Sequence, residues 1–302
     1  MEYCEFCGFD GNAQALRVIS KLERYGDDPY GLNLTLGVIS GIIKYPYDAE
    51  YATKKLKKKK FGYFKSEEDI IEKLKEKKLF FFCNRCAVAY LVEAADDISM
   101  AISDFEDGIK KGCIHLRDVT MYRKHRDKEI SKFRDEFKKY YDENSKKQSE
   151  EPMIATAIRM LNSLRNSLII DAAQSFVNLL KEWDAPFPPH STARYPRITP
   201  LIENSKYYPV VRMLNDIVKD NVYQDIQIVT PELKGESILS ILIDKMISSV
   251  SLLSIKDLQS PNAKKSESKI AKLISKNYID GFAKEITDSH IYGGDKKNAK
   301  FI

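Results

Sequence analysis

Glycine and proline are both scarce in this sequence, which has 13 and 11 of them among its 302 residues. β-Sandwiches with many tight turns and low-complexity disordered chains are richer in these two residues, so the composition argues against both classes. Lysine, glutamate, leucine, isoleucine and alanine favour helices. The composition therefore indicates a folded, helical protein, and the length suits one large domain or two medium ones.

Long apolar runs are also missing, and so is a strong charge of either sign. The most apolar stretch, 238–255, is interrupted by Asp244 and Lys245, and a transmembrane helix needs about 18 apolar residues in a row. The first residues lack the basic and apolar regions of a signal peptide, so we expect a cytoplasmic protein without membrane contact. The net charge of +5 is too small for a protein that binds nucleic acid through its overall charge, but it suits a small anionic ligand.

Cysteine is limited to five residues, four of which form two CxxC pairs. The pairs Cys4–Cys7 and Cys83–Cys86 make up the ligand count of a structural zinc site. The separation between the pairs is much longer than in ordinary zinc modules. Buried free thiols are therefore the simpler interpretation, and both alternatives stay open.

Almost every patterned segment has the helical period. The spacing predicts helices over 12–25, 33–45, 66–79, 85–111, 130–141, 155–183, 207–219, 235–253 and 264–276. Strand signals are confined to two short segments without hairpin partners, 79–82 and 226–229. The proline-rich stretch 186–196 predicts a bend or a linker.

The segment YLVEAADDISMAISDFEDG carries a line of carboxylates along one side of its predicted helix. Asp96, Met100 and Asp104 are spaced by four residues, Asp107 follows, and Glu93 lies one turn earlier. Such a line is either a solvated acidic face or a site for a metal ion or a sugar hydroxyl. The apolar stripe on the opposite side is predicted to be buried and consists of Leu91, Ala95, Ile98, Ile102, Phe105 and Ile109.

Several blocks occur in an order that matches a known family. They are FDGNAQALRVISKLE, GLNLTLGVISGIIKYPY, KKFGYFKSE, YLVEAADDIS with ISDFEDG, PELKGESILSILIDKMI and KLISKNY. Together they cover most of residues 9–278, and the chain resembles the deoxyguanosinetriphosphate triphosphohydrolases (dGTPases) of the HD superfamily. The resemblance implies an all-α, HD-domain-like helical bundle, with a partial catalytic core over 1–184 and a C-terminal helical region over 185–302.

The resemblance also implies a reaction and a set of site residues. Family members hydrolyse a deoxynucleoside triphosphate to the deoxynucleoside and tripolyphosphate, using a divalent metal, Mg²⁺ or Mn²⁺, held by two histidines and two aspartates. The first Asp of the EAADDI motif, Asp96, matches a metal ligand, and Asp104 matches the residue that binds the sugar 3′-hydroxyl. Lys44 and Tyr45 match the KYP motif and would contact phosphate and sugar or base. Met100 stands where the family has a sugar-packing Tyr.

The histidines that this chemistry needs are missing from the sequence. Its four histidines are His115, His125, His190 and His290; none is followed by Asp, and all come after the FDGNAQ block. One aspartate cannot hold a catalytic divalent ion. We therefore expect an HD bundle that is incomplete at its N-terminus and inactive alone, because of a split gene, a truncation or a degenerate subunit.

Two functions follow as alternatives. In the first, the chain works in dNTP hydrolysis together with a complementing N-terminal fragment. In the second, it is a non-catalytic nucleotide-binding or regulatory subunit of an intact homologue. Either alternative implies a homo- or hetero-oligomer.

The run KKLKKKK at 54–60 stands outside this scheme. Clustered lysines can bind nucleic acid or the triphosphate of an allosteric nucleotide. A solvated loop in front of FGYF is the simpler interpretation.

Overall fold

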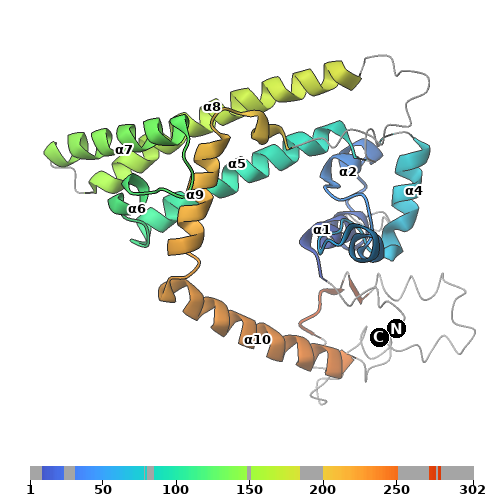
Figure 1. The fold of residues 1–302 in the computed structure, drawn as a ribbon. Helices are drawn as coiled ribbons and strands as arrows, with labels where there is room; N and C mark the ends of the chain where they lie inside the picture. The colour runs from blue at the N-terminus through green and yellow to red at the C-terminus, as the bar shows by residue number, and fades with distance from the viewer. Residues whose placement is uncertain are drawn as a thin grey trace, which may run out of the picture. The chain divides into compact units, whose positions relative to one another are not determined.

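The computed structural model describes residues 9–23, 31–77, 79, 85–147, 151–183, 200–250, 272–276 and 278–279. These residues form helices and their connections, with no β-strand among them (Figure 1). The all-α prediction is thus confirmed, and the architecture agrees with an HD-domain-like helical fold. None of the described helices is long and apolar enough to cross a membrane.

The described α-helices vary from a single turn to more than eight turns. They are α1 Gly11–Arg17, α2 Leu36–Ile42, α3 Ala49–Tyr51, α4 Glu68–Glu76, α5 Ala87–Lys110, α6 Leu116–Thr120, α7 Lys128–Lys146, α8 Pro152–Trp183, α9 Tyr208–Asn221 and α10 Ile226–Val250. Two π-helical segments, Val18–Leu22 and Ala52–Leu56, continue α1 and α3. Two 3₁₀ turns, Lys65–Glu67 and Leu201–Asn204, complete the helical elements.

The chain folds into two compact units. One consists of residues 40–44 and 74–230, and the other of residues 1–39, 45–73 and 231–302. The domain boundary predicted between 184 and 185 falls on residues outside those that the structure describes, and it stays a prediction.

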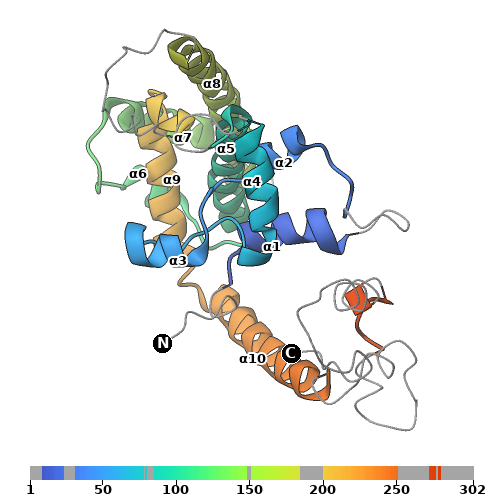
Figure 2. The same ribbon diagram turned by 90° about the vertical axis from the view of Figure 1, so that its right-hand side faces the viewer.

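In the unit containing residues 74–230, α5 is the central element. It packs against α8 and α9, and α7 packs against α8 and α9 (Figures 1 and 2). The largest fully buried side chains of this core include Phe105 from α5, Phe137 from α7, Leu161 and Leu168 from α8, and Met213 from α9. This core fixes which side of α5 faces the protein interior, and therefore which side presents the carboxylates.

The buried side of α5 departs from the predicted stripe at two positions, because Leu91 is only half-buried and Ala95 is exposed. Ile98, Ile102, Phe105 and Ile109 are buried as predicted. The prediction for Ala95 is wrong, because Ala95 is exposed and Ala94 is buried in its place. The spacing Ala94, Ile98, Ala101, Phe105 keeps a four-three-four rhythm, which follows one helix face better than a step through position 95.

The end of α5 was predicted correctly. Lys111 is the C-terminal cap, and Gly112 follows at φ 74°, in the left-handed region where a side chain is unfavourable. The N–H groups of Cys113 and Ile114 both donate to the carbonyl of Gly108, at 2.9 and 3.1 Å. These bonds satisfy a carbonyl that the end of the helix would otherwise leave unpaired.

The other unit is organised around Asp10, which is 4% exposed. Its Oδ1 accepts the backbone N–H of Asn12 at 2.8 Å and caps α1, and its Oδ2 accepts the N–H of Phe61 at 3.3 Å. One carboxylate therefore ties the start of α1 to a segment about fifty residues later. The small core beneath it consists of Ala13, Ala49, Ala52, Phe61 and Phe64.

Two segments have a different secondary structure from the one that the sequence indicates. The predicted helix 33–45 is shorter, because Asn33 has φ 52° and the helix starts at Leu36, where Thr35 Oγ1 accepts the N–H of Val38 at 3.4 Å. The weak strand signal at 226–229 does not lead to a strand, since these residues form the first turn of α10. Asp225 Oδ1 accepts the N–H of Gln227 at 2.8 Å, and this cap starts a helix despite the β-branched residues.

Most residues of the other weak strand signal, 79–82, and of the predicted helix 264–276 lie outside the described residues.

Candidate functional site

The acidic side of α5 is approached by one cation from the end of α2. Lys44 Nζ lies 3.6 Å from Glu93 Oε1 and 3.8 Å from Asp96 Oδ2, so a single ammonium group joins two carboxylates one turn apart. The last turn of α2 lies against the start of α5, since a Cβ built at Gly41 would make ordinary van der Waals contact with the Val88 side chain at 3.5 Å. The structure thus brings together Lys44 and Asp96, two of the predicted site residues, which are about fifty positions apart.

Glu93 is the hub of this cluster. Its side chain is 12% exposed, and its second oxygen, Oε2, lies 2.9 Å from Arg85 Nη2. The carboxylate is therefore held between two cations in a partly buried place, where ion pairs are stronger than at the surface. We infer that Glu93 fixes the position of the Lys44 ammonium, because a lysine side chain paired with one exposed aspartate alone would keep most of its rotamer freedom.

Arg85 is itself held firmly in front of α5. Its guanidinium lies over the Tyr90 ring at 4.2 Å, and its second terminal nitrogen, Nη2, also donates to the carbonyl of Ala89 at 3.1 Å. Its Nε is buried without a hydrogen-bond partner among the described residues. The arginine is therefore packed as part of the protein and is not a freely moving surface cation.

Asp96 and Met100 both face outward. The Asp96 side chain is 56% exposed and Met100 is 55% exposed, so an apolar side chain lies at the surface one turn from the carboxylate. An exposed carboxylate can exchange its lysine partner for a ligand at low cost, since the ion pair in water is weak.

Asp97 lies next to this cluster and is half-buried. Burial raises the pKa of its carboxyl group, the Lys44 ammonium opposes this, and the neighbouring Glu93 and Asp96 carboxylates add to the rise. The same group contributes to a raised pKa of the Tyr208 hydroxyl on α9, which burial causes in the first place. The ionised form of Asp97 is thus less favourable in the folded protein than in the unfolded chain.

Asp97→Asn is expected to raise the melting temperature at pH 7 and to have little effect near pH 3. At low pH both states hold the proton, so ionisation changes nothing. As the pH rises through the unfolded pKa, the unfolded chain ionises first, and folding stability falls until the pH passes the raised folded pKa. Thermal unfolding at both pH values measures the difference, with Asp107→Asn on the exposed side of α5 as the control. An equal shift at both pH values would contradict the expectation.

Asp104 has a hydrogen-bond partner that the sequence does not indicate. Tyr223, just after α9, donates its hydroxyl to Asp104 Oδ2 at 2.7 Å, and the two residues are 119 positions apart. A carboxylate offers about four lone-pair positions, so this bond leaves Asp104 with capacity to accept a sugar hydroxyl. Asp104 lies a little over two turns beyond Asp96 on α5.

Tyr45, the fourth predicted site residue, belongs to the other compact unit. It is half-buried, and its ring centroid lies 6.0 Å from that of Tyr47. Its predicted contact with a sugar or base stays a prediction.

The described residues do not by themselves complete a metal site. No group of three or more His, Cys, Asp or Glu side chains in this part of the chain is arranged to hold a metal ion. Asp96 offers one exposed carboxylate, but Glu93 is already neutralised by Lys44 and Arg85. A divalent ion bound to Asp96 would need further ligands from outside these residues.

The zinc prediction cannot be placed on the described fold, because Cys4, Cys7 and Cys83 lie outside the described residues. Cys86 is the N-terminal cap residue of α5 and a buried free thiol. Cys113 is also a buried free thiol, and burial raises its pKa.

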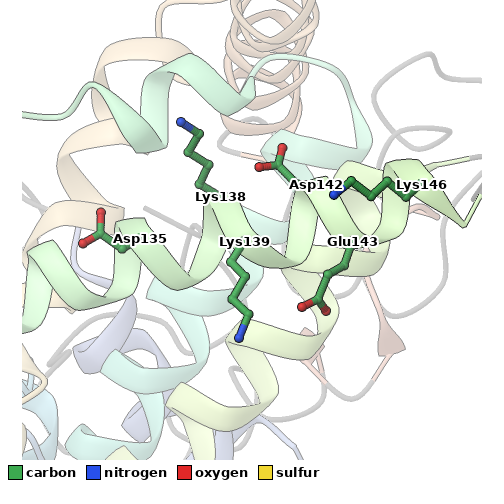
Figure 3. Close-up of a pocket in the computed structure, with 6 residues that line it drawn as sticks. All are labelled: Asp135, Lys138, Lys139, Asp142, Glu143 and Lys146. Atoms are coloured by element: carbon green, nitrogen blue, oxygen red, sulfur yellow. The ribbon is translucent and has the colours of Figure 1, made fainter.

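A surface hollow of about 470 Å³ lies elsewhere, along α7. All of its lining residues come from this one helix (Figure 3): Asp135, Lys138, Lys139, Asp142, Glu143 and Lys146. Three cations and three anions balance each other, so the hollow favours neither sign of ligand. It contains none of the residues that the sequence predicted for the site.

Sequence reasoning missed Arg85, Glu93 as a partner of Lys44, and Tyr223. Glu93 was placed on the correct face by its spacing, but nothing in the sequence pairs it with cations from two other segments. The Tyr223 contact has no local signal at all, since only the packing of α9 against α5 creates it.

No family model matches this chain. A deoxyguanosinetriphosphate triphosphohydrolase-like protein of Listeria monocytogenes is 30% identical over 285 residues, which are 93% of this chain and 58% of the relative. A probable deoxyguanosinetriphosphate triphosphohydrolase of Pseudomonas aeruginosa is 28% identical over 254 residues, covering 78% of this chain and 48% of the relative. A deoxyguanosinetriphosphate triphosphohydrolase of Klebsiella pneumoniae is 33% identical over 112 residues, 35% of this chain and 21% of its own length. The chain therefore spans 58% of the length of the Listeria relative and 48% of the length of the Pseudomonas relative.

Proposed function

This chain is a homologue of the deoxyguanosinetriphosphate triphosphohydrolase-like proteins over most of its length, and we propose that it acts in deoxynucleoside triphosphate hydrolysis. The reaction adds water to a dNTP and releases the deoxynucleoside and tripolyphosphate. The observation that carries the proposal is the cluster in which Lys44 joins Glu93 and Asp96 on the outer side of α5.

The roles of the chain's own residues follow from this cluster. Lys44 carries a compact positive charge that suits a phosphate oxygen, and Glu93 holds it beside Asp96. Glu93 in turn needs Arg85, because a carboxylate that is 12% exposed is costly to bury without a second strong partner. Asp104, oriented by Tyr223, accepts a hydrogen bond from the deoxyribose 3′-hydroxyl.

The divalent metal of this chemistry would be held by Asp96 together with ligands that the 302 residues do not provide. The sequence contains no His-Asp dipeptide, and the described residues hold no ligand cluster. When bound, such an ion supplies charge stabilisation at the phosphate and activates water. We therefore propose that a segment carrying His…His-Asp, in the same protein or in a separate chain, completes the site.

The 302-residue chain alone is expected to release no tripolyphosphate from dGTP above background with Mn²⁺ or Mg²⁺. The physical reason is that one aspartate cannot hold a catalytic ion. Adding a polypeptide that contains the His…His-Asp segment, encoded beside this chain, is expected to start the reaction. Chromatography that separates deoxyguanosine and tripolyphosphate from dGTP checks both points. Robust hydrolysis by the pure chain would mean that a different set of ligands does the chemistry.

Binding separates the two candidate functions. A non-catalytic nucleotide-binding subunit is favoured by one observation, that Glu93 is paired with both Lys44 and Arg85 and is therefore a poor candidate for a metal ligand. If the chain binds dGTP tightly but no complementing segment produces hydrolysis, the regulatory alternative holds. In both cases Lys44→Ala is expected to weaken dGTP binding by about ten- to a hundredfold. Lys110→Ala, which removes an exposed lysine from α5, is the matched control.

A further inference from the structure

A cluster of polar side chains joins α9 to the turn of residues 121–127, which connects α6 to α7. The α9 members of the cluster are spaced by four residues, so they lie along one side of that helix. The turn provides Tyr122, Lys124 and His125, and α9 provides Arg212, Asp216 and Asp220. All six residues belong to the unit that contains residues 74–230. The cluster is separate from the carboxylates on the outer side of α5.

Two contacts of this cluster keep the same form throughout the pH range around neutrality. The Tyr122 hydroxyl donates to Asp216 Oδ2 at 2.5 Å, and Lys124 Nζ lies 2.5 Å from Asp220 Oδ2. Burial raises the pKa of the Tyr122 hydroxyl, and the hydrogen bond to Asp216 raises it further. The hydrogen bond to Asp220 likewise raises the pKa of Lys124. Both groups therefore remain donors, and they hold the turn against α9.

His125 is the member of the cluster with two competing partners. Its Nε2 lies 3.2 Å from Arg212 Nη2 and 3.3 Å from Asp216 Oδ2. The side chain of His125 is 36% exposed and that of Asp216 is 29% exposed, so water reaches the pair without surrounding it. A guanidinium can only donate and an ionised carboxylate can only accept. One ring nitrogen therefore cannot satisfy both partners at once.

The protonation state of the ring decides between these partners. In the neutral ring with its proton on Nδ1, Nε2 is an acceptor and can take the hydrogen bond of Arg212. In the protonated ring, Nε2 carries a hydrogen and shares the positive charge, so it donates to Asp216 and repels Arg212. Histidine is the side chain whose charge ordinarily changes between pH 5 and 8. Since the two partners are four residues apart, a proton moves the bond of His125 by one turn of α9.

The other charged groups around the ring keep their charge over this range. Arg134 of α7 donates from Nη1 to the carbonyl of Tyr122 at 3.1 Å, and Arg123 donates from Nη1 to the same carbonyl at 2.8 Å. Arg126 follows the histidine in the turn, and Asp127 caps α7 by accepting the N–H of Glu129 at 2.7 Å. Arginine does not lose its proton in proteins, and aspartate ordinarily ionises far below neutral pH. The histidine is therefore the group of this cluster that titrates near neutrality.

We propose that His125 is a proton switch, which moves the contact of the α6–α7 turn from Arg212 to Asp216 as the pH falls. Near pH 8 the neutral ring accepts a hydrogen bond from Arg212. Near pH 5.5 the charged ring pairs with Asp216, and Arg212 loses its bond to the turn. The turn keeps its place through Tyr122 and Lys124, so the change is local and reversible. This proposal does not depend on the hydrolysis proposed above.

The first test determines which ring nitrogen of His125 carries the proton. The 302-residue chain is labelled with ¹⁵N at histidine, and long-range ¹H–¹⁵N spectra are recorded between pH 5 and pH 8. The signals of His125 are the ones that disappear in the His125→Gln variant. At pH 8 we expect the Nδ1–H form, which leaves Nε2 free to accept. The Nε2–H form at pH 8 would overturn the proposal, because that nitrogen could not accept from Arg212.

The second test compares substitutions of the two partners by thermal unfolding at pH 5.5 and pH 8. Arg212→Ala is expected to lower the melting temperature by about 2–4 °C at pH 8, the effect of about one lost hydrogen bond, and not to lower it at pH 5.5. Asp216→Asn keeps an acceptor for Tyr122 but loses the negative charge. It is expected to lower the melting temperature by about 2–4 °C more at pH 5.5 than at pH 8. Lys219→Ala, at an exposed position of the same helix, is the matched control and should show no such difference.

A third comparison removes the titrating group itself. In a His125→Gln background the side chain at 125 can contact either partner, but it carries no charge at any pH. Arg212→Ala and Asp216→Asn are then each expected to have the same effect at pH 5.5 and pH 8. Two results of thermal unfolding would overturn the proposal. They are equal effects of Arg212→Ala at both pH values in the wild-type chain, and a pH difference that survives in the His125→Gln background.

Discussion

Asp96→Ala is expected to abolish hydrolysis in the complemented enzyme, with a loss of at least about a hundredfold in kcat/KM. Mutating the outer partners of metal ligands costs about 10- to 100-fold, and removing a ligand itself costs more. Asp96 is the more exposed carboxylate of the cluster. Its ion pair with Lys44 is long, with 3.8 Å between Nζ and Oδ2. Steady-state hydrolysis of dGTP, with metal concentration varied, measures the loss.

Substitutions of two other aspartates on α5 test whether the effect is specific to Asp96. Asp104→Ala should mainly raise KM, by about 5- to 150-fold, because an unpaired polar group costs about 1–3 kcal/mol. Asp107→Ala, one turn further along and exposed, should leave both parameters unchanged. Small and equal effects of Asp96→Ala and Asp104→Ala would show that α5 does not carry the site.

Gly62→Ala is expected to reduce the free energy of unfolding by at least about 3 kcal/mol. A loss of this size is expected because the added methyl group would push two backbone segments apart. A Cβ at this position would lie 1.9 Å from the carbonyl oxygen of Tyr45 and 2.8 Å from its carbonyl carbon. Backbone atoms cannot rotate away as a flexible side chain can. The hydrogen bond from Gly62 N–H to Tyr47 would be lost when the two segments separate. Urea denaturation followed by circular dichroism measures the change.

Gly11→Ala is the control for this substitution. Gly11 starts α1, and a Cβ there meets nothing within 4 Å. Alanine favours helix and restricts the unfolded chain, so this change should be neutral or slightly stabilising. If Gly62→Ala were equally harmless, the close approach of the two segments would not exist in solution.

Local helical structure was predictable where side-chain spacing alone decides it. Long helices such as α5 and α8 combine a steady apolar period with a clear stop, and their bounds fall within a few residues of the prediction. The sequence is misleading where two local preferences oppose each other. At 226–229 the β-branched residues favour a strand, but the Asp225 cap and the following helical residues outweigh that preference. On α5 the apolar period was correct, and one member of the buried side was placed at Ala95 instead of at Ala94.

The sequence by itself determined which residue types line the outer side of α5, and that the histidines for a metal site are missing, because both are matters of composition and of spacing within one helix. Only the tertiary structure decided that Lys44 and Arg85 meet at Glu93, and that Tyr223 reaches Asp104. These partners come from segments up to 119 positions apart. Periodicity reports which side of a helix is apolar, but it holds no information on which other segment packs there, since that is set by how all the apolar faces fit together.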